Sequence, residues 1–272
     1  MKGTIFEKIV DAKRERIAKA KRGIHLKTLT ERALSVRAGR QSHRLRQALS
    51  DASQINIIAE FKRASPSKGI INDSVDVAAV ANAYERGGAK AISVLTEEDF
   101  FKGSLDDLRA VRNAVDLPIL RKDFIFDAYQ IYEAAEAGAD AILLIAAMLD
   151  NEALAELHHL AEVSLGLDAL VEVHTLRELE RVKDIRVRLT GVNNRDLQTF
   201  NVSLDVSREL IKHAPKDAVM IAESGLKTRD DLMELQELGY SGFLIGETLM
   251  TSDDPEAKLR IFAKEDVEKV LR

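Results

Sequence analysis

The pattern of hydrophobic and polar positions changes near residue 55. Before that point, apolar residues recur at helical spacing and predict two amphipathic helices, over residues 4–22 and 28–51. After it, short apolar runs alternate with segments of helical period. The runs predict strands over residues 55–60, 91–95, 118–121, 141–145, 169–173, 189–193, 219–223 and 242–246. The segments between and after them predict helices over residues 75–86, 105–115, 128–137, 151–163, 177–182, 204–213, 229–238 and 255–262.

This alternation predicts the fold class. Near-continuous apolar runs are typical of strands buried on both faces of a parallel sheet, and strands alternating with helices indicate βαβ units. Eight such units in about 200 residues fit an α/β protein with a (β/α)8 TIM barrel. An open, doubly wound sheet is the alternative, but no Gly-x-Gly-x-x-Gly follows the first run. We expect a single domain over residues 1–272, with a helical extension over 1–51 and the barrel over 52–272.

Charge is distributed unevenly along the chain. The net charge of −5 combines +10 over residues 1–50, from 14 Lys and Arg against 4 Asp and Glu, with −15 over the remaining 222 residues. A basic segment can bind nucleic acid, but this one lacks the interleaved aromatic residues that stack on bases. We therefore favour a basic helical extension that lies on an acidic body.

Several classes of protein are excluded by composition. The chain has no cysteine, so it has no disulfide, zinc–thiolate site or cysteine nucleophile. Residues 1–22 contain no apolar stretch typical of a secretory signal, and the longest apolar run, residues 141–149, falls short of the about 20 residues that span a bilayer. We expect a cytoplasmic protein without a membrane partner. We also expect no metal site, because no second histidine has ligand spacing to His174.

Polar and charged residues gather at the ends of the predicted strands. In a barrel, the carboxyl ends of the strands build the active site. Unpaired burial of ionisable groups is costly, so their concentration at one rim indicates a site, although any one of them can be a structural ion pair. These ends carry Glu60, Lys62, Lys122, Glu172, Asn193, Arg195 and Glu223.

The last two predicted strands carry a second signal. Barrel enzymes often bind a phosphate there, through backbone N–H groups of the loops and a short helix. Ser224 and Gly225 follow one strand and Gly246 ends the other. Because glycine lets a backbone approach an anion closely, these positions predict a phosphate site.

Five motifs at these positions resemble those of the indole-3-glycerol phosphate synthase family. They are IAEFKRASPS at 58–67, LRKDF at 120–124, LVEVH at 170–174, GVNNRDL at 191–197 and AESG at 222–225. The resemblance runs over essentially the whole chain, including the basic extension. It implies closure of the indole ring of 1-(2-carboxyphenylamino)-1-deoxyribulose 5-phosphate, with loss of carbon dioxide and water, in tryptophan biosynthesis. It implies no metal or organic cofactor and a phosphorylated small molecule as the partner. Separately from the resemblance, we expect no nucleic-acid partner and a monomer.

The resemblance assigns chemistry to the strand-end residues. It makes Lys122 the general acid near the ribulose carbonyl, with a pKa that neighbouring cations and burial are expected to lower toward neutrality. It makes Glu172 the general base that assists dehydration. Glu60 and Lys62 share one face and are expected to orient the substrate and assist proton transfer. Asn193 is expected to position a substrate hydroxyl.

The same resemblance predicts the substrate-binding residues. Arg195 is expected to bind a carboxylate, which suits a planar guanidinium. Phe124 and Leu144 are expected to contact the aromatic ring, with ordinary barrel packing as the alternative for each. The other predicted contacts are Ser65 and Glu223 to the substrate, and Ser224, Gly225 and Gly246 to its phosphate.

Two features lie outside these motifs. Many relatives carry a serine after the last glycine, where this chain has Glu247; we expect that side chain to point away from the phosphate. The loop over residues 65–73 contains Pro66, Gly69 and alternating polar residues, so we predict a lid that closes over the substrate.

Three alternatives stay open. Another phosphate-binding barrel enzyme, such as phosphoribosylanthranilate isomerase, relies on a cysteine base that this chain lacks. An inactive or re-engineered descendant would keep the motifs, although all the strand-end residues expected for catalysis are present. The third is a scaffold that binds nucleic acid through its basic extension.

Overall fold

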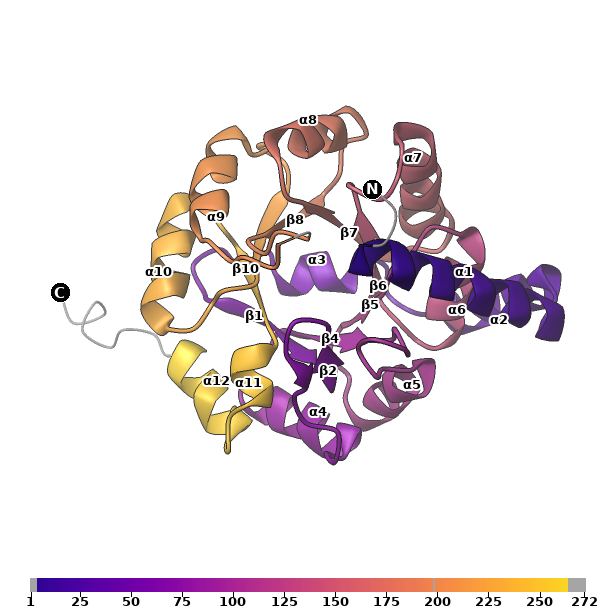
Figure 1. Cartoon of the computed structure of the whole chain (residues 1–272), viewed down its shortest axis with the longest axis horizontal. Coiled ribbons are helices and arrows are strands. Elements are labelled where there is room, and N and C mark those ends of the chain that lie inside the picture. Colours follow the sequence, from indigo (N-terminus) through magenta and orange to yellow (C-terminus); the bar gives the residue numbers. More distant parts are fainter. Residues whose placement is uncertain (1–3, 198, 264–272) are drawn as a thin grey trace.

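Eight parallel strands form a closed barrel in the structure, a computed structural model that describes residues 4–197 and 199–263 (Figure 1). The strands follow one another around the barrel in chain order, and β1 closes it by pairing with β4 and β10. The predicted (β/α)8 class is therefore confirmed, whereas residues 264–272 of the predicted barrel segment lie outside the described residues. The strands are β1 Asn56–Phe61, β4 Ala91–Leu95, β5 Ile119–Lys122, β6 Ala141–Ile145, β7 Asp168–Val173, β8 Leu189–Asn193, β9 Val219–Glu223 and β10 Gly242–Ile245.

Helices surround the barrel and bury one face each against the strands (Figure 1). Most begin at a polar N-cap whose side chain accepts a backbone N–H, as Ser104 and Asp127 do. A π-turn over Leu160–Ser164 and a 3-10 turn over Ile211–His213 extend α7 and α9. The outer helices are α4 Val77–Arg86, α5 Leu105–Ala114, α6 Ala128–Glu136, α7 Asn151–His159, α8 Leu176–Asp184, α9 Asp205–Leu210, α10 Arg229–Leu238 and α12 Pro255–Ala263.

The extension before the barrel consists of α1 Ile5–Gly23, α2 Leu26–Arg37 and α3 Arg44–Ala48. The single helix predicted over residues 28–51 is wrong. Gly39 and His43 adopt left-handed backbone conformations, with φ of 85° and 56°, and these end α2 and turn the chain into α3. Periodicity alone did not reveal this break, because both helices keep apolar residues at helical spacing.

Helix α3 closes the amino-terminal end of the barrel. Its Leu45, and Leu49 directly after it, are fully buried in a cluster with apolar side chains from all eight strands. At this end the extension is thus part of the barrel interior. The strand residues of the cluster are Ile58, Ala91, Leu120, Ala141, Leu143, Ile145, Leu170, Leu189, Ile221 and Leu244.

Basic residues of the extension pair with acidic residues of the barrel. In α1, Arg16 lies 2.6 Å from Asp99 and Lys21 2.6 Å from Asp127. At the other end of the barrel, Arg44 lies 3.4 Å from the buried Asp140. These contacts confirm the predicted packing of a basic extension on an acidic body.

Three short elements escaped prediction. Two-residue strands β2 Ala64–Ser65 and β3 Gly69–Ile70 form an antiparallel hairpin within the predicted lid, and α11 Glu247–Met250 follows β10. Within the described ranges, none of the helices combines the length and apolar character needed to cross a membrane.

Candidate active site

A cavity of about 420 Å³ opens at the carboxyl ends of the strands. Its walls contain charged side chains from the strand ends, apolar side chains from several loops, and the glycines that follow the last two strands. The structure therefore brings together most of the predicted site. The predicted residues that line the cavity are Glu60, Lys62, Ser65, Lys122, Phe124, Glu172, Asn193, Arg195, Ser224, Gly225 and Gly246.

Leu144 does not line this cavity, and the expectation that it contacts a substrate ring is corrected. Its side chain is fully buried in the layer between the strands and the outer helices. Side chains alternate along a strand, so the neighbours Leu143 and Ile145 point inward and line the cavity instead. The β6 run is apolar at every position, and for this reason the sequence did not reveal which residues face inward.

Lys122 lies at the centre of the ionisable groups. Its Nζ donates to Glu223 Oε2 at 2.8 Å and lies 3.7 Å from Glu172 and 3.9 Å from Glu60. Burial alone would lower the pKa of Lys122, but Glu223, Glu172 and Glu60 raise it above its ordinary value. The expected shift toward neutrality is therefore wrong, because the charges that surround this ammonium are carboxylates. The raised pKa keeps Lys122 protonated, so its ammonium can stabilise a developing oxyanion and can pass its proton to that oxygen as the negative charge builds up.

Glu223 lies beneath the cavity rather than in its wall. It is 1% exposed, and its one close charged partner among the described residues is Lys122. Burial raises the pKa of Glu223 to about 7, and the Lys122 ammonium offsets this only in part. Gly191 on the neighbouring strand makes this placement possible, because a Cβ there would collide with Oε1 of Glu223. Glu223 therefore contacts Lys122 and does not line the cavity.

Glu60 and Lys62 form a second ion pair at the end of β1. Lys62 Nζ donates to Oε1 of Glu60 at 2.6 Å. Burial would raise the pKa of Glu60, but Lys62 and Lys122 together bring it below its ordinary value. Gly246, at the end of β10, leaves room for this carboxylate, since a Cβ there would collide with it. The glycine thus shapes the catalytic end of the cavity as well as the predicted phosphate end.

His174 contacts the predicted general base. Its Nε2 lies 3.4 Å from Glu172 Oε1, and its Nδ1 lies 3.6 Å from Glu178 Oε2. Burial lowers the pKa of His174, but Glu178 and Glu172 outweigh it and raise the pKa above its usual value. The available sequence signal was the Thr-x-x-Glu pattern at 175–178, which begins a helix and brings Glu178 back toward the residues before it.

The opposite end of the cavity has an unusual backbone. Ser224 and Gly225 both have positive φ, 65° and 80°, and the Nδ2 group of the buried Asn194 donates to the carbonyl oxygens of Glu223 and Ser224. The non-glycine residue in this conformation is strained, and such strain is concentrated at binding sites.

Two cationic residues of the rim pair with the unexpected carboxylate of Glu247. Lys68 Nζ, from the β2–β3 hairpin, lies 3.2 Å from Glu247, and Arg195 Nη2 lies 3.8 Å from it. The Glu247 side chain is therefore directed toward these two cations. Arg195 also donates to the carbonyl oxygen of Phe200 at 3.4 Å, and Asn193 Oδ1 accepts the backbone N–H of Arg195 at 3.0 Å.

The apolar wall of the cavity includes a segment that the sequence did not assign to the site. Ile5, Phe6 and Ile9 of α1 line it, and the rings of Phe6 and Phe124 meet edge to face at 5.8 Å. The signal was present in the apolar face of the first predicted helix, but periodicity does not tell which surface such a face covers. The other apolar lining residues are Leu95, Phe101, Leu143, Ile145, Leu197, Phe200, Val202, Leu226, Leu244 and Ile245.

Among the described residues, one group with the geometry of metal ligands lies outside this cavity. It consists of His43, Glu162 and Asp168, at the amino-terminal end of the barrel. Arg46 already lies 3.5 Å from Glu162 and 3.6 Å from Asp168, so the protein itself supplies the compensating cation. We assign this group a structural role in fixing α3.

The closed barrel and the ionisable cavity at the carboxyl ends of its strands define a TIM-barrel enzyme. The sequence profile of a family described as indole-3-glycerol phosphate synthase matches residues 6–262. The chain therefore belongs to the indole-3-glycerol phosphate synthase family.

Individual relatives agree with this assignment. The chain is 47% identical over 263 residues to indole-3-glycerol phosphate synthase from Carboxydothermus hydrogenoformans, which covers 94% of this chain and 98% of that protein. It is 45% identical over 264 residues to the protein of the same name from Paracidovorax citrulli, with 95% and 99% covered.

Solved structures of more distant proteins share only the fold. A thiamine phosphate pyrophosphorylase from Pyrococcus furiosus superposes with a TM-score of 0.60 at 18% identity, covering 84% of this chain and 100% of that chain. A 3-hexulose-6-phosphate synthase from Salmonella typhimurium gives a TM-score of 0.61 at 12% identity, with 77% and 97% covered.

Proposed function

We propose that this chain is an indole-3-glycerol phosphate synthase: it converts 1-(2-carboxyphenylamino)-1-deoxyribulose 5-phosphate into indole-3-glycerol phosphate, carbon dioxide and water. The observation that carries the proposal is the position of Lys122, a protonated lysine among three carboxylates at the base of a cavity with an apolar wall. An aromatic substrate that must gain a proton on a carbonyl oxygen and lose one elsewhere requires such a combination.

In the proposed mechanism, Lys122 donates a proton to the ribulose carbonyl oxygen while the carboxylate-bearing ring carbon attacks the carbonyl carbon. The new carbon–carbon bond closes the five-membered ring. Loss of carbon dioxide returns the bond electrons to the ring. The hydroxyl formed from the carbonyl then takes a proton from the Lys62 ammonium and leaves as water. Glu172 takes up the proton that is lost in this dehydration, and its contact with Lys122 at 3.7 Å allows the acid and the base to serve the same face of the substrate.

The ion pair of Glu60 and Lys62 orients the ribulose hydroxyls and assists proton transfer, together with Asn193. Glu223 acts by holding the Lys122 ammonium. The phosphate is bound by Ser224, Gly225 and Gly246. Ser65 helps to anchor the substrate. Arg195 gives up its contact with Glu247, at 3.8 Å, and binds the substrate carboxylate instead. Phe124 and Leu143 contact the aromatic ring.

We further propose that the extension and barrel act as one unit, a monomer in the cytoplasm without a nucleic-acid partner. The ion pairs between the extension and the barrel support this, because they occupy cations that would otherwise be free to bind phosphates. Light scattering at micromolar concentration and DNA binding at physiological salt test the two statements.

The activity is tested by mixing the protein with the carboxyphenylamino substrate in EDTA and following indole fluorescence. The chain contains no tryptophan, so tryptophan emission from the protein does not overlap the indole signal. We expect Lys122→Ala and Glu172→Gln to lower kcat by about 100-fold or more, with Lys216→Ala, an exposed lysine, as the matched control. Tight binding of the substrate without indole formation by the wild type would instead indicate a descendant with altered chemistry.

A further inference from the structure

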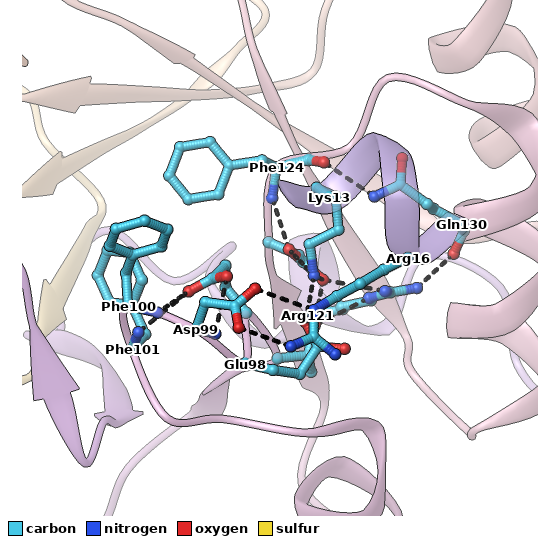
Figure 2. A network of polar contacts seen from close by, with 12 residues as sticks. Lys13, Arg16, Glu98, Asp99, Phe100, Phe101, Arg121, Phe124 and Gln130 are labelled. Atoms are coloured by element: carbon cyan, nitrogen blue, oxygen red, sulfur yellow. Dashed lines mark hydrogen bonds and ion pairs between the residues drawn. The ribbon is translucent and has the colours of Figure 1, made fainter. Parts of the chain in front are cut away.

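A buried lysine of the N-terminal helix bridges two barrel loops beside the active site. Lys13, in α1, is 3% exposed. Its Nζ donates to Glu98 Oε2 at 2.8 Å and to Asp123 Oδ2 at 3.1 Å, and it lies 3.0 Å from Asp123 Oδ1. Figure 2 shows this ammonium within a network that joins the helix to residues from both loops. Burying a lysine is costly unless its partners are fixed, so this contact ties three elements together.

Asp123 is the centre of the network on the barrel side. It follows Lys122 directly, and its carboxylate also accepts from Thr96 Oγ1 at 2.7 Å and from Arg121 Nη2 at 3.0 Å. Burial would raise the pKa of Asp123, but Lys13 and Arg121 lower it to about 2, so the carboxylate stays ionised. Its Oδ1 accepts the backbone N–H of Phe124 at 2.8 Å, which fixes the turn that directs the Phe124 ring into the cavity.

The second partner, Glu98, belongs to the loop between β4 and α5. The neighbouring Glu97 is fully buried, and its carboxylate accepts the backbone N–H groups of Phe100 at 2.7 Å and Phe101 at 3.0 Å (Figure 2). This folds the loop so that the Phe101 ring lines the cavity, 6.2 Å from the Phe124 ring.

Helix α1, the loop after β4 and the loop after β5 therefore contact one another at two places. On the outer side they meet at the Lys13 ammonium. On the cavity side they meet as three aromatic rings, Phe6 of α1, Phe101 and Phe124. Without the ammonium, Glu98 would keep only Arg16, at 3.5 Å, and Asp123 only Arg121, at 3.0 Å, so no cation among the described residues would join the two loops to each other.

We propose that Lys13 is a positioning residue for binding of the substrate's aromatic ring. Its charge holds α1 and the two loops at the separation at which the three phenylalanine rings form one wall of the cavity. Lys13 touches neither the cavity nor the reacting groups, and its effect passes through Asp123 and Glu98. The inference rests on the proposed function in one respect, the aromatic character of the substrate.

The test compares Lys13→Met with Lys21→Met in the indole-forming assay. Lys21 is a matched control, because it is also an α1 lysine paired with a barrel aspartate, Asp127, at 2.6 Å, but its side chain is exposed. We expect Lys13→Met to raise KM about tenfold while kcat changes less than about threefold, and Lys21→Met to leave both within about twofold. An unchanged KM in a folded Lys13→Met protein would overturn the inference.

A double-mutant cycle separates positioning from general destabilisation. Phe6→Ala removes the α1 ring directly, so if Lys13 acts by positioning that ring, the double variant should raise KM no more than about twofold beyond the larger single effect. KM effects that multiply would count against the inference.

If Lys13→Met does not fold, Glu98→Gln breaks the same bridge at a half-exposed residue and should raise KM by about threefold. An unchanged KM in that variant would also refute the inference. A wild type without indole formation would refute the proposed function instead.

Discussion

The ammonium of Lys122 and the carboxylate of Glu223 are 2.8 Å apart at the base of the cavity, and this ion pair is closer than either contact of Lys122 with Glu172 or Glu60. A lysine has four rotatable bonds, so its position in the cavity depends on what holds its end. The nearest group that holds the ammonium is the carboxylate of Glu223, which does not line the cavity.

Replacing Glu223 by Gln should therefore misplace Lys122. We expect kcat to fall by about 100-fold, because the ammonium would move toward Glu172 and Glu60, and a displacement of about 1 Å is costly in rate. KM should change little, since Glu223 lies outside the cavity wall. Steady-state kinetics measure both quantities, with Glu209→Gln, an exposed carboxylate paired with Lys212 at 2.6 Å, as the control. An equal loss in both variants would show that Lys122 does not depend on its nearest carboxylate.

His174 should stabilise the fold in a pH-dependent way. Its folded-state pKa is raised by Glu178 and Glu172, so its contribution is fully present below the unfolded value of about 6.5 and is lost as pH rises through the higher folded value. Urea unfolding at pH 6 and pH 9 should show that His174→Gln costs about 1 kcal/mol more at the lower pH. A cost that does not depend on pH would mean that folding leaves the pKa of His174 unchanged, which would contradict the prediction.

Gly246→Ala should lower activity more than stability. The added Cβ would collide with Glu60 and displace its carboxylate from Lys62, so we expect kcat to fall about tenfold or more. The control is Gly23→Ala, at the end of α1, where a Cβ meets nothing within 4 Å. That control should leave kcat unchanged and should be neutral or stabilising by about 0.5 kcal/mol. The idea fails if the two alanine variants have the same kcat.

Leu143→Ala and Leu144→Ala test the two faces of β6. Leu144→Ala opens a void between the strands and the outer helices and should cost about 2–5 kcal/mol of unfolding free energy with an unchanged KM. Leu143→Ala removes part of the cavity wall and should raise KM. Denaturant titration and kinetics on both proteins decide the assignment, which is contradicted if Leu144→Ala is the variant with the higher KM.

The hairpin of β2 and β3 overlaps the loop over residues 65–73 that we predict to be a lid. Lys68 at its turn is more than half exposed and pairs only with Glu247 among the described residues. Tryptic cleavage after Lys68 should slow severalfold when the product is bound, whereas cleavage after the exposed Lys216 should not change. Equal cleavage rates with and without product would remove the lid from the mechanism.

Individual residues show which features of the site the sequence could predict and which it could not. The strand ends that carry Glu60, Lys122 and Glu172 were predictable, because parallel strands in a barrel bring their carboxyl ends to one rim. Leu144 was not, since β6 is apolar at every position and its pattern does not distinguish the faces. The pKa of Lys122 depends on which charges lie within about 4 Å, which only the closed barrel determines. The α1 wall was missed for the same reason, because a helical pattern does not specify its partner.

The barrel interior is completed by a segment that is synthesised before any of the barrel strands. Leu45 and Leu49 need contacts from every strand up to β10, so the segment that closes the base must wait until nearly the whole barrel has been made. Contacts of such long sequence separation form late and slowly. During synthesis the extension therefore carries apolar side chains whose binding surface does not yet exist. Helix α3 can dock fully only when the barrel strands are complete.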